Sequence, residues 1–123
     1  MVMKMSEEVI QNKTDYSVEP EGYAVENFPE HITKIDDDTY KVKMRDGTYY
    51  IVADVEYSDI KKVIDRSRSG DGRVKEEHAM DGLFKKAILY PKLDDEKINK
   101  LKGSHFFKLQ KAFSIIFDIE SFL

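Results

Sequence analysis

The last twenty residues of the chain, 104–123, are too apolar for the surface of one small domain. On a helix with about 100° per residue, their apolar side chains cover an arc of about 220°, whereas an ordinary surface helix needs about 100°. These side chains are Phe106, Leu109, Ala112, Phe113, Ile115, Ile116, Phe117, Ile119, Phe122 and Leu123. A chain of 123 residues cannot readily enclose a terminal helix on all sides. We therefore expect the spare face to meet another molecule.

The protein-interaction site expected from this pattern consists of Phe106, Phe113, Ile115, Ile116, Ile119 and Phe122. Two sides of the arc can be distinguished by helical spacing. The side expected to face the chain's own core carries Phe106, Phe113, Ile116 and Phe117. The side expected to face the partner carries Ile115, Ile119 and Phe122. The partner is either a second copy of the chain, giving a homo-oligomer, or a different protein.

Composition excludes several classes of function. The chain has no cysteine, which rules out disulfides, thiolate nucleophiles and cysteine-ligated metal sites. No apolar run approaches the roughly 18 residues of a membrane span. The first residues lack the apolar segment of a secretory signal. These features predict a soluble cytoplasmic protein without a membrane partner.

Charge is distributed unevenly along the sequence. Residues 1–39 carry ten Asp and Glu against three Lys, and residues 40–123 carry fourteen against seventeen Lys and Arg. A binder of phosphate backbones concentrates Lys and Arg on one face with little acid between them. Here the basic pairs are interleaved with Asp and Glu, so a nucleic-acid partner is not expected.

The first 35 residues show no sustained period of 2 or 3.6 and contain Pro20, Gly22 and Pro29. This pattern predicts an acidic, flexible arm over residues 1–35, with a short extended piece near residues 23–28. The alternative is a segment that folds on a partner, anchored by Tyr16, Tyr23, Val25 and Phe28. Residues 36–123 are then a single domain.

A β-hairpin is expected from residue 39 onward. Apolar and basic residues alternate up to Asp46-Gly47, and a second strand-like run follows over residues 48–53. Asp-Gly between two alternating runs is a strong signal for a two-residue turn. Such a turn would set Met44 opposite Tyr49 and gather one buried face from Tyr40, Val42, Met44, Tyr49, Ile51 and Ala53.

Helical patterns occupy the remaining sequence. They cover residues 58–65, 74–89, 95–102 and 104–123, with a loop at 66–73. Asp94 is the expected N-cap of the third helix, flanked by a Leu93–Ile98 hydrophobic staple. Gly103 is expected to close that helix and Ser104 to cap the last one. The predicted fold class is α+β, with an N-terminal β-hairpin or small antiparallel sheet followed by a cluster of about four helices.

No pattern in the sequence indicates catalysis or a bound cofactor. The histidines His31, His78 and His105 lie in three separate segments. Glu77, His78 and Asp81 fall near one another on a helix, where a solvated surface is the ordinary explanation and a metal or acid–base site is the alternative. We therefore expect no enzyme activity and no catalytic, cofactor or metal site, although a site assembled from scattered residues would leave no local pattern.

The region from the hairpin to the C-terminus resembles the tail assembly chaperones of long-tailed bacteriophages and prophages. The strand pair leads directly into Asp59-Ile60-Lys61-Lys62-Val63-Ile64-Asp65. A later helix runs into Ala87-Ile88-Leu89-Tyr90-Pro91-Lys92-Leu93-Asp94-Asp95-Glu96-Lys97-Ile98-Asn99-Lys100-Leu101, and an apolar helix closes the chain. The Pro91-Lys92-Leu93 element before an acidic cap is the most specific part of the resemblance.

The resemblance implies a non-enzymatic protein of the bacterial host cytoplasm. Such chaperones keep the tape measure protein soluble while tail tube subunits polymerise around it, and they leave the finished particle. The expected partners are apolar helical segments of the tape measure protein, the tail tube protein and further copies of this chain. Two alternatives stay open. The first is a structural phage completion or adaptor protein, or another oligomeric interaction module. The second is a small enzyme or nucleic-acid regulator with an unrecognised site.

Overall fold

The computed structural model describes residues 15–118 apart from residues 69 and 74. The strands are β1 (Tyr23–Ala24), β2 (Ile32–Asp36), β3 (Thr39–Lys43), β4 (Tyr49–Ala53) and β5 (Ile88–Tyr90). The helices are α2 (Tyr57–Arg66), α3 (Glu76–Ala87), α4 (Asp95–Asn99) and α5 (Gly103–Ile116).

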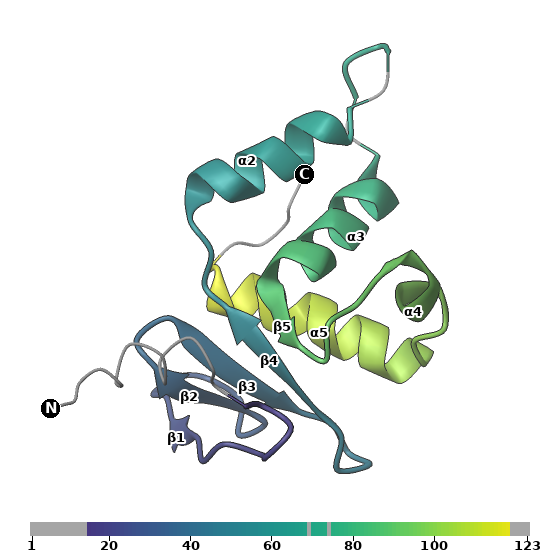
Figure 1. Ribbon diagram of the computed structural model, residues 1–123. Helices are drawn as coiled ribbons and strands as arrows, with labels where there is room; N and C mark the ends of the chain where they lie inside the picture. The colour runs from purple at the N-terminus through teal and green to yellow at the C-terminus, as the bar shows by residue number, and fades with distance from the viewer. Residues whose placement is uncertain (1–14, 69, 74, 119–123) are drawn as a thin grey trace, which may run out of the picture.

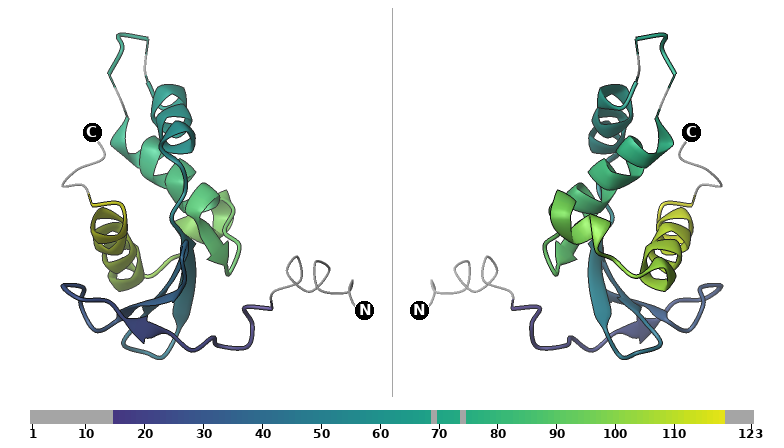
Figure 2. Two further views of the ribbon diagram at one scale, coloured as in Figure 1. Left: turned by 90° about the vertical axis from the view of Figure 1, so that its left-hand side faces the viewer. Right: turned by 90° about the vertical axis from the view of Figure 1, so that its right-hand side faces the viewer.

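The strands form one antiparallel sheet in the order β1-β2-β3-β4-β5, and the helices gather beyond its β4–β5 side (Figure 1). This arrangement confirms the predicted α+β class. α5 lies across one face of the sheet, whereas residues 15–22 pass along the opposite face (Figure 2). α2 lies at the end of the molecule farthest from β1 and β2 and packs against α3.

The N-terminal part of the sheet corrects the predicted domain boundary. β2 pairs with β3 from Ile32 opposite Val42, and the Ile32 side chain is only 1% exposed. The ring of Phe28 packs 5.9 Å from that of Tyr40. The segment from Tyr23 to residue 35 thus belongs to the folded domain, and its strands are too short for a periodic signal. Residues 1–14 of the predicted arm lie outside the described part.

The hairpin of β3 and β4 is present, but its register differs by one residue from the prediction. Lys43 pairs with Tyr49 and the Met44 N–H donates to the Thr48 carbonyl at 2.7 Å, so the three residues 45–47 form the loop. Gly47 has φ +92°, and its N–H donates to the Met44 carbonyl at 3.1 Å. This is the pattern of a type I turn followed by a left-handed residue, the common three-residue hairpin loop. Asp-Gly is compatible with both loop lengths, and the longer one was not anticipated.

The corrected register divides the hairpin side chains differently between the two faces. A one-residue slip moves a whole strand's side chains to the other face of the sheet. Tyr40 and Val42 therefore share the core face with Tyr50 and Val52. The predicted members Tyr49, Ile51 and Ala53 lie on the opposite face.

The core lies between this sheet face and the helices α3 and α5. Its central side chains are fully buried and come from Val42, Val52, Leu83, Phe84, Leu109, Ala112 and Phe113. Each large apolar side chain transferred from water in this way stabilises the fold by roughly 1.5–3 kcal/mol. α5 is therefore held by its own chain along most of its length.

Three predicted helix boundaries are wrong. α3 ends at Ala87, and the next three residues form β5, which pairs with β4 through Ile51 opposite Tyr90. Tertiary pairing at the sheet edge overrides the helical pattern there. α5 begins at Gly103 with Lys102 as N-cap, so neither the predicted stop at Gly103 nor the Ser104 cap is present.

The cap of α4 is confirmed. The Asp94 side chain accepts a hydrogen bond from the Lys97 N–H at 2.9 Å. Leu93 and Ile98 are both buried in the core, as expected for a hydrophobic staple. α4 is shorter than predicted and ends at Asn99.

Candidate protein-interaction surface

Two of the six predicted interaction residues belong to the chain's own core. Phe113 is fully buried and packs 5.1 Å edge-to-face against Phe84 of α3. Ile116 is 7% exposed and lies in the same cluster. Neither side chain can reach a partner while the domain stays folded. This confirms that both lie on the side expected to face the core and corrects their inclusion in the interaction site.

Of the other four predicted residues, the structure describes two. Phe106 and Ile115 are half-buried and pack against the edge of the core. Ile119 and Phe122 lie outside the described residues. Of the predicted outward set, only Ile115 can therefore be placed, and part of its surface is open to solvent.

Phe107 is the exposed aromatic residue that the sequence pattern did not identify. Its side chain is 67% exposed. It lies nine positions before Ile116 in α5, which is about 180° around the helix from that core residue. A single aromatic residue opposite the buried stripe adds nothing to a periodic pattern, so its exposure could be recognised only in the structure.

Phe107 is connected to the core by a chain of ring contacts. The Phe106 and Phe107 rings lie 5.4 Å apart and nearly perpendicular, and Phe106 lies 5.4 Å from Phe84. Aromatic pairs at such separations favour edge-to-face or tilted geometry. The buried rings hold Phe106, which in turn supports the exposed ring of Phe107. We call Phe106 and Phe107 the α5 surface.

A second apolar surface lies on α2. This helix is amphipathic, with Ile60, Val63 and Ile64 on one side, yet no residue between Tyr57 and Arg66 is buried. Ile60 and Val63 pack against the core, and Tyr57 at the start of the helix is 74% exposed. The apolar side of α2 is thus only partly covered by the described chain.

Gly82 sets the close approach of α2 and α3. A Cβ atom at this position would lie 2.7 Å from Cγ1 of Val63, closer than real Cβ contacts.

His78 and Asp81, the predicted alternative site on α3, line a surface pocket of about 640 Å³ together with charged residues from α2, α3 and α4. The side chain of Glu77 is not described.

A buried polar cluster joins the hairpin loop to the start of α5. His105 is buried, with Nδ1 2.9 Å from the Tyr50 hydroxyl and Nε2 3.1 Å from Oδ2 of Asp46. Hydrogen bonds from Thr48, together with His105, lower the pKa of Asp46 to about 2. Burial raises the pKa of Tyr50, and the nearby charge of Asp46 raises it further. The partners lie more than 50 residues apart, so no local motif could predict them.

This cluster has the character of a structural link. Both ring nitrogens of His105 have partners, and the partners fix the position of α5 on the sheet. Within residues 15–118, excepting 69 and 74, no group of three or more metal-ligating side chains comes together. Across the same described part, no helix has the length and apolar character required to cross a membrane.

Comparison with known proteins adds no assignment. A scan against protein-family models and searches of curated proteins and of solved structures found no significant match to the chain. The function is therefore inferred from the residues and the geometry described above.

Proposed function

We propose that this protein is a non-catalytic assembly chaperone that binds apolar helical segments of a client. The observation that carries the proposal is the exposed ring of Phe107, which is continuous with the half-buried Phe106 and with the core. Large exposed aromatic side chains on a rigid helix are typical anchors for protein partners. The apolar side of α2, with Tyr57 exposed, offers a second region of the same kind.

The chemistry of the α5 surface favours a helical client held reversibly. An amphipathic helix presents anchors three or four residues apart to an apolar groove or ridge. Ser104 and Lys111 are exposed beside Phe107, so the apolar area is small and bounded by polar groups. Limited apolar area with a polar rim suits a chaperone that must release its client.

We propose the tape measure protein of a long-tailed phage or prophage as the client. This part of the proposal rests on the resemblance to tail assembly chaperones. The residues that carry it run from Asp59 in α2 through the Pro91-Lys92-Leu93 element to α5. On this proposal the protein works in the bacterial cytoplasm, associates with its own copies and meets the tail tube protein while the tube polymerises.

Co-expression with the tape measure protein of the same phage or prophage tests this function. The full chain should increase the soluble fraction of the tape measure protein and co-purify with it. Purified finished particles, measured by mass spectrometry, should then lack the chain. Its presence in finished particles at stoichiometric amounts would favour a structural completion protein, and an unchanged soluble fraction would contradict a chaperone.

A further inference from the structure

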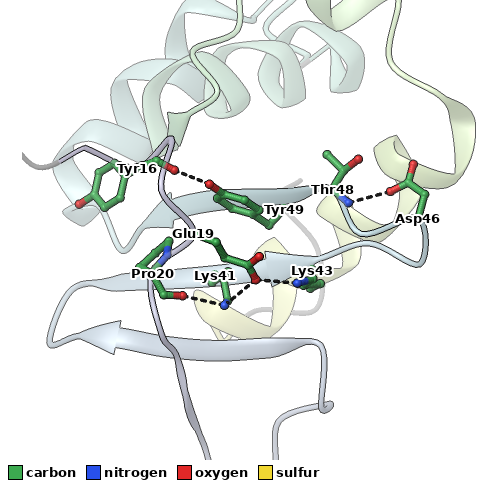
Figure 3. Close-up of polar contacts among 8 residues, drawn as sticks. All are labelled: Tyr16, Glu19, Pro20, Lys41, Lys43, Asp46, Thr48 and Tyr49. Atoms are coloured by element: carbon green, nitrogen blue, oxygen red, sulfur yellow. Dashed lines mark hydrogen bonds and ion pairs between the residues drawn. The ribbon is translucent and has the colours of Figure 1, made fainter.

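Residues 15–22, which we call the strap, cross the sheet face opposite α5 (Figure 2). The face beneath them is made by side chains of β3 and β4 that point away from the core, including Lys41, Lys43 and Tyr49. Figure 3 shows the strap passing beside these side chains, with Glu19 directed toward Lys41 and Lys43. The sheet therefore carries a third surface, which is separate from the α5 surface and from the apolar side of α2.

The strap is held to this face by polar contacts. Oε2 of Glu19 lies 2.9 Å from Nζ of Lys41 and 2.6 Å from Nζ of Lys43 (Figure 3). Lys41 also donates to the carbonyl of Pro20 at 2.7 Å, and the Tyr49 hydroxyl donates to the carbonyl of Tyr16. The face thus binds one carboxylate and two main-chain carbonyls of an extended segment.

A pocket of about 440 Å³ extends this face beyond the strap. Its lining includes the cationic side chains of Lys41, Lys43, Arg45 and Lys108 and the carboxylates of Glu19 and Glu30. Burial lowers the pKa of His31 at the same pocket, and the charges of Lys108 and Lys111 lower it further, as expected in a cationic environment. Thr33 Oγ1, also in the lining, is buried without a hydrogen-bond partner among the described residues.

The strap itself is weakly anchored. No residue from Asp15 to Gly22 is buried, and Val18 is 70% exposed. Segments with few buried apolar contacts open at low free-energy cost. By contrast, Lys41 beneath the strap has a side chain only 12% exposed. Displacement of the strap would therefore uncover the lysine pair while leaving the core intact.

We propose that this cationic face binds an extended acidic peptide segment of a partner protein, and that the strap is its internal competitor. The face already holds a peptide of this chemistry, with Glu19 between two lysines and two carbonyls as acceptors. A peptide supplies main-chain carbonyls at these positions, whereas a nucleic-acid backbone does not. The carboxylates Glu19 and Glu30 at the pocket also disfavour a long run of phosphates.

Fluorescence anisotropy with a labelled synthetic peptide tests the proposal. The probe copies residues 15–22, and a control peptide replaces its three carboxylates by amides. In the full chain, Glu19→Gln removes the competing charge, so the acidic probe should bind about threefold or more tightly than to the wild type. The double variant Lys41→Gln/Lys43→Gln should bind it more weakly than Glu19→Gln by at least the same factor.

The matched control is Lys61→Gln/Lys62→Gln, which removes two exposed lysines from α2 and should leave binding unchanged. Circular dichroism of each variant verifies the fold. The proposal is overturned if Glu19→Gln binds the probe no better than the wild type, or if the amide peptide binds equally well. It is also overturned if a single-stranded oligothymidine binds more tightly than the peptide through Lys41 and Lys43. These outcomes leave the chaperone proposal untouched because neither Phe106 nor Phe107 lines this face or its pocket, and none of the variants changes a residue of α5.

Discussion

The Tyr50 hydroxyl lies 2.9 Å from Nδ1 of His105 and thereby links the middle of the sheet to the first turn of α5. The two rings meet edge-to-face with centroids 5.7 Å apart. The second ring nitrogen of His105 lies 3.1 Å from the Asp46 carboxylate in the hairpin loop. Because no side chain in the described part of the structure caps the N-terminus of α5, this link is a main polar anchor of the helix.

Tyr50→Phe should destabilise the domain by about 1–2 kcal/mol, because it leaves Nδ1 of the buried His105 without its partner. Urea unfolding followed by circular dichroism measures this change. The matched control is Tyr49→Phe, which removes a hydroxyl that donates to the exposed strap and should have a smaller effect. Equal effects of the two substitutions would show that the Tyr50–His105 contact has no special role.

Asp46 should make stability depend on pH in the acid range. Its pKa is lowered from 3.8 to about 2 by hydrogen bonds from Thr48 and by His105. The unfolded state therefore binds a proton more readily than the folded state. This contribution is complete above about pH 4 and is lost as the pH falls through about 2.

The measurement compares the melting temperature of the wild type with that of Asp46→Asn between pH 2 and 5. Asn can still accept from the Thr48 N–H but has no charge to titrate. The difference in melting temperature by which the wild type exceeds the variant should decrease as the pH falls through this range. A constant difference would show that the ionised Asp46 carboxylate does not contribute.

The elements that could be predicted from the sequence were those with a dense local signal. The alternation around Tyr40 and the Asp46-Gly47 pair identified the hairpin, and Asp94 identified the start of α4. The hairpin register was missed because the Asp-Gly pair fits two loop lengths, and only the hydrogen bond of Gly47 to Met44 distinguishes them.

Long-range contacts explain the remaining differences. β1 and β5 have two and three residues, so they exist as strands only through pairing with β2 and β4. The Asp46–His105 contact spans 59 residues and leaves no local motif. For the candidate site, helical spacing correctly placed Phe113 and Ile116 on the side that faces the core, but the exposure of Phe107 could be read only from the folded structure.

Phe28→Ala tests whether the N-terminal segment belongs to the domain. We expect a loss of about 1–2 kcal/mol, because Phe28 packs on Tyr40 and against the core. Val18→Ala, in the exposed strap, should change stability by less than about 0.5 kcal/mol. Chemical denaturation of both variants gives the comparison. A neutral result for Phe28→Ala would restore the picture of an arm outside the core.

Gly82→Ala should destabilise the α2–α3 pair by about 1 kcal/mol or more, despite the higher helix propensity of Ala. The added Cβ would lie 2.7 Å from the stiff side chain of Val63. Gly103→Ala, at a helical glycine with open space around it, should be neutral or stabilising. Thermal unfolding compares the two, and Val63→Ala added to Gly82→Ala should recover part of the loss. Equal effects at both glycines would rule out the close approach.

The central claim is that the exposed ring of Phe107 anchors an apolar client. Its most direct test is co-purification of the tape measure protein with the wild type, Phe107→Asp and Lys111→Asp in parallel. Phe107 and Lys111 are both exposed on α5, so both variants should keep the wild-type circular dichroism spectrum. We predict that Phe107→Asp reduces the recovered client about tenfold or more, whereas Lys111→Asp retains most of it. Undiminished recovery with a folded Phe107→Asp variant would contradict the account.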